Sequence, residues 1–246
     1  MISVESLSFR YPNAEQDALR SISLECVEGS STAIMGANGS GKSTLARCLN
    51  GLLLPTAGRV LVDGLSTADA SALPTIRRSV GLVFQDPHVQ MTSPSIEREL
   101  AFGLQNIGMA KEEIHRRVDE ELQRLGFARR RADPPSTLSG GEKQRLALAS
   151  VLMLQTKYLV LDEPTSFLSP SSRRQLMQEV FHLHHDRNVT LILITPYLAE
   201  ALNTDRVIVL HSGMMAFDGT PHALAAQRNA LRSWGIRVPR DFQEMV

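Results

Sequence analysis

The run GANGSGKST at residues 36–44 constrains the fold of this chain more than any other part of its sequence. It fits the pattern G-x-x-x-x-G-K-[ST] and lies between a short apolar run (31–35) and a segment with leucines at helical spacing. In such a phosphate loop, backbone N–H groups turn around phosphate oxygens, and the N-terminus of the next helix reinforces them. We expect Lys42 to supply a cation to the β- and γ-phosphates and the Ser43 hydroxyl to bind Mg²⁺. The expected phosphate-binding residues are Gly36, Ala37, Asn38, Gly39, Ser40, Gly41, Lys42, Ser43 and Thr44.

A second motif places two carboxylates after a buried strand. The apolar residues 159–161 are followed directly by Asp162 and Glu163. The strand places Asp162 at the edge of the sheet, where its carboxylate can hold Mg²⁺ through water. Glu163, one residue later, can polarise the attacking water as a general base. Together with the phosphate loop, this pair predicts a nucleotide and Mg²⁺ as ligands.

Strand-like and helical patterns alternate along the chain. Strands are expected at 2–9, 19–27, 31–35, 58–63, 80–84, 159–161 and 190–195, with a closing hairpin at 207–210 and 214–217. Residues from about 87 to 150 instead show helical periodicity and many charges, as in 111–125, and a further helix is expected at 141–154. This alternation favours an α/β fold with a largely parallel sheet covered on both faces and a helical insertion.

Composition limits the kinds of partner. Lysine plus arginine equals aspartate plus glutamate, 26 against 26, which gives no electrostatic case for nucleic acid as the main partner. No stretch reaches the ~18 apolar residues that a membrane span needs, and the N-terminus lacks a signal-peptide pattern. We therefore expect a cytoplasmic chain. If it works at a membrane, another subunit must supply the spanning helices.

Some suggestive residues have a simpler structural interpretation. Cys26 and Cys48 are too few for a disulfide framework and are expected to be buried, although reactivity at Cys48 stays an alternative. His182, His184 and His185 are expected on a solvated helix face, with a metal site as the alternative.

The segment LSGGEKQR at 138–145 lies between the phosphate loop and the Asp162–Glu163 pair, and it resembles the signature of ABC transporter ATPases. The resemblance covers essentially the whole chain. It implies a P-loop NTPase core with a largely parallel sheet, an N-terminal antiparallel β part and an inserted helical subdomain. The implied ranges are 1–86 and 155–222 for the core, 87–154 for the helical subdomain with the signature, and 223–246 for a C-terminal tail.

The same resemblance assigns further residues. Gln85 is implied to reach Mg²⁺ and to sense the membrane subunit, and Tyr11 to stack on adenine. Ser139, Gly140 and Gly141 are implied to contact the γ-phosphate held by a second chain. The catalytic set is then Glu163, Gln85 and Lys42, and the metal set is Ser43, Gln85 and Asp162. One motif thus implies both a nucleotide and a second ATPase subunit.

A finer resemblance lies in GLVFQDPHVQ (81–90) and IERELAFGLQNIGM (96–109), which are similar to the ATPases of energy-coupling factor importers for cobalt, nickel or vitamins. In such systems two ATPases drive a transmembrane coupling protein and a separate substrate-capturing membrane protein. The resemblance implies a chain that lies peripherally on the inner face of the cell membrane and energises import.

Two positions depart from the family pattern. After the strand at 190–195, Pro196 takes the place of a histidine that contacts the γ-phosphate, and proline offers no side-chain donor and no N–H. Tyr197 as a substitute is a weaker alternative. Ser169 replaces the aspartate that usually ends the loop after Glu163. We expect this chain's own site to bind ATP but hydrolyse it slowly, which makes more sense in a heterodimer than in a homodimer.

Two other functional classes stay open. The chain is alternatively a mainly structural or regulatory ATP-binding subunit whose partner hydrolyses. A third class is a non-transport ABC protein handling nucleic acid or ribosomes, which usually carries tandem domains, a long coiled coil or basic extensions that this sequence lacks.

Overall fold

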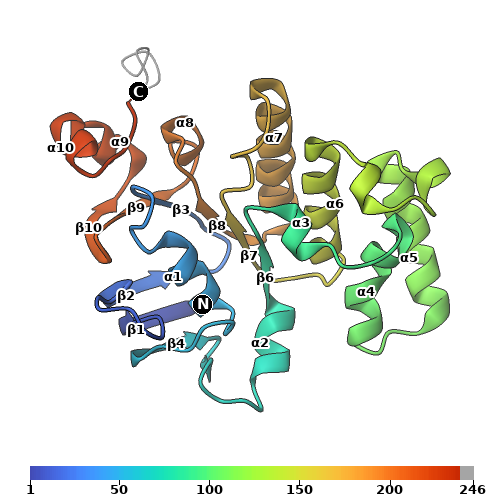
Figure 1. Cartoon of the computed structure of the whole chain (residues 1–246), viewed down its shortest axis with the longest axis horizontal. Coiled ribbons are helices and arrows are strands. Elements are labelled where there is room, and N and C mark those ends of the chain that lie inside the picture. The colour runs from blue at the N-terminus through green and yellow to red at the C-terminus, as the bar shows by residue number, and fades with distance from the viewer. Residues whose placement is uncertain (239–246) are drawn as a thin grey trace.

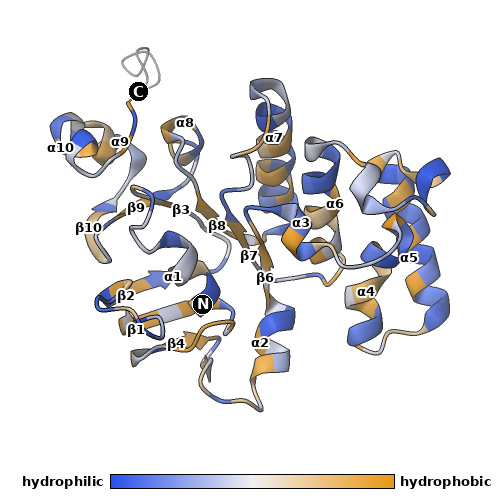
Figure 2. Ribbon diagram, in the orientation of Figure 1, coloured by the Kyte–Doolittle hydropathy of each residue, from blue (hydrophilic) through white to orange (hydrophobic). Residues whose placement is uncertain are grey.

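The central feature of the computed structural model, which describes residues 1–238, is a six-stranded sheet with the order β10-β9-β3-β8-β7-β6. All its neighbouring strands are parallel except the hairpin β9–β10. Every residue of β3, β7 and β8 is buried, as expected for parallel strands covered on both faces. Figure 2 shows this apolar layer crossing the middle of the molecule. The strands are β3 (Ser31–Met35), β6 (Val80–Val83), β7 (Tyr158–Asp162), β8 (Thr190–Ile194), β9 (Arg206–His211) and β10 (Met214–Gly219).

A second, antiparallel sheet lies beside the first, with the order β2-β1-β4-β5 (Figure 1). Its strands are β1 (Ile2–Phe9), β2 (Leu19–Cys26), β4 (Ala57–Val62) and β5 (Leu65–Ser66). Helix α1 (Lys42–Leu49) shares one hydrophobic core with both sheets, because its buried side chains Leu45 and Leu49 pack with residues of each. The phosphate loop that precedes α1 is therefore held between two sheets.

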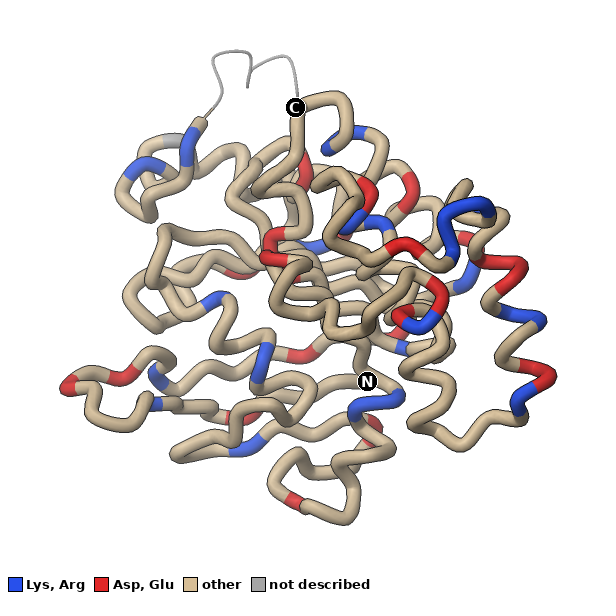
Figure 3. The backbone as a smooth tube through the Cα atoms, turned by 45° about the vertical axis from the view of Figure 1, so that its right-hand side comes forward, with Lys and Arg blue, Asp and Glu red and all other residues tan. Residues whose placement is uncertain are grey.

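A helical part forms the side of the molecule away from the antiparallel sheet (Figure 1). It consists of α3 (Pro87–Gln90), α4 (Ile96–Asn106), α5 (Lys111–Leu125), α6 (Gly140–Leu152) and the short turns η1 (Ala128–Arg130) and η2 (Pro135–Thr137). It has its own core, to which α5 contributes Ile114, Val118, Leu122 and Leu125 at helical spacing. The other faces of its helices carry charges of both signs (Figure 3).

The remaining helices cover the central sheet. They are α2 (Leu73–Ser79), α7 (Pro170–Arg187), α8 (Leu198–Ala201), α9 (Pro221–Ala225) and α10 (Arg228–Ser233). No helix within residues 1–238 combines the length and the apolar character that a membrane crossing requires.

The structure confirms the expected fold class: an α/β core with a largely parallel sheet, an antiparallel N-terminal part and inserted helices. The strand predictions are confirmed to within a residue or two at their ends, and α6 lies at 140–152 instead of 141–154. Helix α2 was not predicted from the sequence. Residues 239–246, the end of the predicted tail 223–246, lie outside the described residues.

The prediction of a solvated histidine face is wrong for one of the three residues. His184 is only 6% exposed, and its Nδ1 lies 2.7 Å from the backbone oxygen of Val189. His182 is exposed and pairs with Asp186. Within the described residues, no group of three or more His, Cys, Asp and Glu side chains could hold a metal ion. Cys26 and Cys48 are buried, and burial raises the pKa of each thiol to about 12, which argues against a reactive Cys48.

Candidate nucleotide-binding and catalytic site

The phosphate loop needs glycine where the chain turns from β3 into α1. Gly36 has φ +144°, and a Cβ placed there would lie 2.1 Å from the backbone oxygen of Leu210. Gly41 has φ +103°, and its Cβ would lie 2.6 Å from the backbone oxygen of Ala18. Larger residues at these two positions would push against backbone that cannot move aside. The loop is thus shaped by β9 and by the turn before β2.

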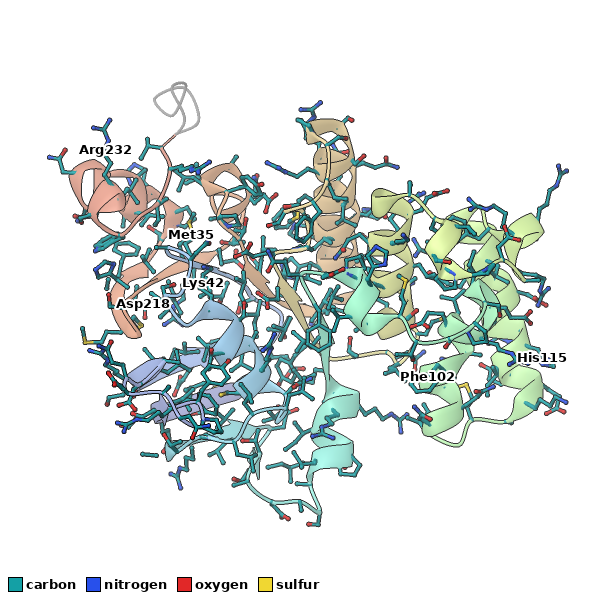
Figure 4. All side chains as sticks on the ribbon, in the orientation of Figure 1. Met35, Lys42, Phe102, His115, Asp218 and Arg232 are labelled. Carbon is teal, nitrogen blue, oxygen red and sulfur yellow. The ribbon has the colours of Figure 1, made fainter. Side chains whose placement is uncertain are left out.

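Lys42, labelled in Figure 4, begins α1. It is almost completely buried, with 4% exposure. Its Nζ donates to the backbone oxygens of Gly36 and Ala37, each at 3.0 Å, and lies 3.7 Å from Glu163 Oε1. Burial lowers the pKa of Lys42, against the opposing effect of the nearby carboxylates. The buried ammonium group of Lys42, which bonds the backbone of the loop, is placed to bind phosphate oxygens.

Ser43 and Asp162 come together although 119 positions separate them. The Ser43 hydroxyl donates to Asp162 Oδ1 at 2.9 Å, at the carboxyl end of β7. Asp162 is 2% exposed, and burial raises the pKa of its carboxyl group although Ser43 lowers it. A hydroxyl, a carboxylate and the nearby Gln85 amide are the hard oxygen ligands that Mg²⁺ prefers. The donor set therefore fits Mg²⁺.

Glu163 follows in a strained conformation, with φ +48°. Its Oε2 accepts hydrogen bonds from Gln85 Nε2 at 3.1 Å and from the Ser166 hydroxyl at 2.9 Å. Gln85 comes from the end of β6, so neighbouring parallel strands β6 and β7 deliver the pair to one edge of the sheet. Ser166 was not predicted as a site residue, although a hydroxyl three positions after a carboxylate on a turn is a signal that could have found it.

Tyr11 stands at the open side of the phosphate loop. Its hydroxyl lies 3.0 Å from Thr44 Oγ1, and its ring packs edge-on against Phe9 with centroids 4.9 Å apart. With 37% exposure, the ring keeps a free surface for stacking. Tyr11 lines a cleft of about 380 Å³ together with residues of the phosphate loop, Gln85 and Glu163. We call it the nucleotide cleft.

One buried atom in the loop has no protein partner. The Ser40 hydroxyl is buried, and no hydrogen-bond partner for it lies within the described residues. Buried hydroxyls are normally paired, so an unpaired one within the phosphate loop fits a site that binds a polar ligand. The residues of the nucleotide cleft thus fit a nucleotide with its metal ion.

The signature segment (138–145) lies apart from this cleft. Ser139 caps α6 in a capping box: its N–H donates to Glu142 Oε2 at 2.7 Å, and Glu142 N–H donates to its hydroxyl at 3.4 Å. Ser139 and Gly140 are exposed, and a Cβ at Gly140 would meet nothing within 4 Å. The structure therefore does not bring Ser139, Gly140 and Gly141 into the nucleotide cleft of their own chain.

A second cleft, of about 850 Å³, adjoins the nucleotide cleft and shares Asn38, Gln85 and Glu163 with it. We call it the side cleft. Pro196 and Tyr197 line it, as do Arg173 from α7 and the C-terminal residues 235–238. Gly235 has φ +74°, and a Cβ there would lie 2.7 Å from Ala37 Cβ, so the end of the described chain touches the phosphate loop. Neither Arg173 nor this contact was predicted.

Ser169, the second departure from the family pattern, has a local structural role. Its hydroxyl caps α7 by accepting a hydrogen bond from the Ser172 N–H at 3.2 Å. Serine is among the preferred N-cap residues, so the helix start is intact although a carboxylate is missing.

Comparisons with known proteins agree with this geometry. The family model described as "ABC transporter" matches residues 19–166. The chain is 41% identical over 244 residues to the energy-coupling factor transporter ATP-binding protein EcfA1 of Clostridium perfringens, covering 98% of this chain and 87% of that one.

Solved structures are similar over most of the chain. The structure of cbiO1 from Clostridium perfringens, described as part of the ABC transporter complex cbiONQ, superposes with a TM-score of 0.81 at 34% identity. It covers 99% of this chain and 98% of that one. The ATP-binding cassette MJ0796, solved as a dimer bound to ADP and phosphate, has a TM-score of 0.80 at 29% identity, with coverage of 90% and 99%.

Proposed function

The chain belongs to the ABC transporter family, and from that membership we propose that it is the ATPase of an energy-coupling factor importer for a metal ion or vitamin. As a family member it is an ATP-hydrolysing subunit of a transporter. The observation that carries the finer proposal is the 41% identity to an energy-coupling factor ATP-binding protein over nearly the whole chain. The cleft supports the ATPase activity, because Lys42, Ser43, Gln85 and Glu163 line it and Asp162 bonds Ser43.

In the proposed arrangement the phosphate loop holds the phosphates of ATP and Tyr11 stacks on adenine. Lys42 exchanges its contacts with the Gly36 and Ala37 oxygens for phosphate oxygens. Ser43, Asp162 and Gln85 hold Mg²⁺, directly or through water. When bound, Mg²⁺ neutralises charge on the β- and γ-phosphates.

Glu163 is the proposed general base. The hydrogen bonds from Gln85 and Ser166 orient its carboxylate, and burial keeps bulk water from screening it. Pro196, where the family has a donor to the γ-phosphate, supplies none. Losing such a donor typically costs a factor of about 10² to 10³ in rate, so we propose that this site hydrolyses ATP slowly.

The signature segment acts on a second ATPase in this proposal. Ser139, Gly140 and Gly141 lie at the exposed N-terminus of α6, where a hydroxyl and free N–H groups favour an anion. Because they lie outside their own nucleotide cleft, the nucleotide they serve belongs to another chain. An intact signature beside a weakened site favours a heterodimer.

A groove between α2 and α4 is the proposed contact with a membrane coupling protein. Phe102, labelled on α4 in Figure 4, is 50% exposed. It lines this groove together with Arg77 of α2. Gln90 connects the groove to the catalytic edge, because its side chain accepts from the Phe84 N–H at 3.1 Å, next to Gln85. A push on this groove can therefore reach Glu163 through Gln85. The chain would lie on the cytoplasmic face of the membrane, and the transported substrate would be captured by another subunit.

The test compares two sites in one assembly. ATP turnover is measured for this chain alone and for the complex with its co-purifying ATPase and membrane subunits. We expect Ser139→Ala to reduce turnover in the complex about 10²-fold and Glu163→Gln to reduce it much less, since the partner's site does most of the work. Ser136→Ala, an exposed serine on η2, is the matched control.

The outcome separates the alternatives. If the isolated chain hydrolyses ATP at a rate equal to that of the complex, the proposal of a weakened own site is wrong. If the complex turns over ATP, the isolated chain does not, and Glu163→Gln leaves turnover of the complex unchanged, the chain is a mainly structural or regulatory subunit whose partner hydrolyses. Binding of the complex to ribosomes or nucleic acid without membrane subunits would instead support a non-transport function.

A further inference from the structure

Arg173 lies near two segments: the loop that follows Glu163 and the segment at 195–197. It lies in the first turns of α7 and lines the side cleft together with Glu163 and Pro196. Its guanidinium carbon lies 3.5 Å from the centroid of the Tyr197 ring, which is a close cation–π stack. Its Nε is buried and has no hydrogen-bond partner within the described residues. The nearest carboxylate oxygen is Glu200 Oε1, at 4.0 Å.

Glu200 is the anchor of this arrangement. It is 6% exposed, and its two carboxylate oxygens accept from Thr165 Oγ1 at 2.7 Å and from Thr195 Oγ1 at 2.5 Å. Both threonines are completely buried. Thr165 is two positions after Glu163, and Thr195 directly precedes Pro196. One buried carboxylate thus connects the loop after the general base to the segment at 195–197.

That segment, which we call the switch segment, has a second tie. The Tyr197 N–H donates to Thr195 Oγ1 at 3.0 Å, so the threonine hydroxyl donates to Glu200 and accepts from Tyr197. Pro196, between them, has neither an N–H nor a polar side chain to bind the reacting groups. The position of the switch segment therefore depends on its own supports: the threonine bonds on one side and the arginine stack on the other.

We propose that Arg173 is a positioning residue for ATP hydrolysis, which holds the switch segment against the Glu163 loop by stacking on Tyr197 and facing Glu200. It acts through Tyr197 and Glu200 and does not touch the nucleotide. An arginine suits this role because its planar guanidinium covers the aromatic ring and presents its edge to a carboxylate at the same time, which a lysine ammonium cannot do. The proposal rests on the ATPase activity of this site.

The test uses the full chain in single-turnover assays with enzyme in excess over MgATP, because such assays detect a slow site. We expect Arg173→Ala to lower the single-turnover rate about tenfold, the size of a partly desolvated cation–π contact, and to leave ATP affinity within about twofold. Tyr197→Ala should have the same effect, and the double variant should be no slower than either single one. Tyr197→Phe, which keeps the ring, should retain most of the single-turnover rate of the unmodified chain, whereas Arg173→Lys should not.

Arg174→Ala is the matched control, since this exposed neighbour on α7 is an equally long cation outside the stack. Thermal unfolding of each variant separates a structural role from a positioning one. The proposal is overturned if Arg173→Ala leaves the rate unchanged, if it lowers only stability or ATP affinity, or if the two alanine substitutions have additive effects. Absence of nucleotide binding by the unmodified chain, measured by displacement of a fluorescent ADP analogue, would instead refute the proposed ATPase site itself.

Discussion

Restoring a histidine at position 196 is the sharpest perturbation that the structure suggests. Pro196 lines the side cleft, as do Asn38 and Glu163, so an imidazole at this position would enter a cleft that the phosphate loop also lines. We expect Pro196→His to accelerate ATP hydrolysis at this chain's own site, because it returns a donor to the γ-phosphate side of the general base.

The magnitude follows from the contacts around the residue. A single transition-state hydrogen bond contributes about 2.7–4 kcal/mol, or a factor of about 10² to 10³. We expect the lower end, about 10²-fold, because Ser169 still lacks the usual carboxylate. Loss of the proline ring should cost about 0.4–1 kcal/mol of stability through the unfolded chain, which is about 1–4 °C in Tm.

The assay measures single-turnover hydrolysis of MgATP by the full chain, together with ATP affinity and Tm. Pro94→His, the same replacement at an exposed position of the helical part, controls for the general effect of the substitution. Adding Glu163→Gln to Pro196→His should abolish the gain, because the new donor works only with the general base.

The reasoning is refuted by either of two results. One is a folded, ATP-binding Pro196→His variant whose rate equals that of the unmodified chain. The other is a rate gain that survives Glu163→Gln, which would show that the histidine acts by a route that does not involve this site's base.

Three further predictions concern the loop, the metal and acid stability. Gly36→Ala should weaken ATP binding at least tenfold in a titration, because the added Cβ would lie 2.1 Å from the Leu210 oxygen at φ +144°; unchanged affinity would contradict the loop geometry. Ser43→Ala should raise the Mg²⁺ concentration for half-maximal turnover about tenfold and leave metal-free nucleotide binding unchanged. Burial raises the pKa of Asp63, but hydrogen bonds from the N-terminal amine, Tyr158 and Lys157 outweigh it and lower the pKa to about 2. Its stabilisation is therefore complete above the unfolded pKa near 4 and is lost as pH falls toward 2. The Tm deficit of Asp63→Asn should be largest at pH 7 and should shrink below pH 4, and a pH-independent deficit would contradict this.

Site residues that lie in a loop or at a strand end of known geometry could be predicted from the sequence. Ser43 and Asp162 meet because a phosphate loop and a strand-end aspartate on parallel strands reach the same edge of a sheet. The position of Lys42 was predictable for the same reason, because it belongs to the phosphate loop. The element order was predictable for a related reason, since alternation of apolar strands and periodic helices has few packed solutions.

Contacts that depend on how elements pack could not be read in this way. His184 looks like a surface residue because the apolar pattern of α7 is weak, and only the turn at Val189 gives its ring a buried partner. The Arg173 stack needs α7 and the switch segment at one separation, which no spacing rule encodes. The approach of Gly235 to Ala37 likewise joins two segments far apart in the sequence through tertiary packing alone.

The place of β3 in the sheet also sets when the ATP site can exist during synthesis. This strand carries the phosphate loop, yet its two neighbours are β8 and β9, and Ser31 at its start bonds Asp205, 174 positions later. A growing chain that has exposed both ATP-binding motifs still lacks both strands that hold the loop in place. The ability to bind ATP should therefore arise only after β9, which ends at His211, has been made, so that shorter nascent chains do not hydrolyse ATP.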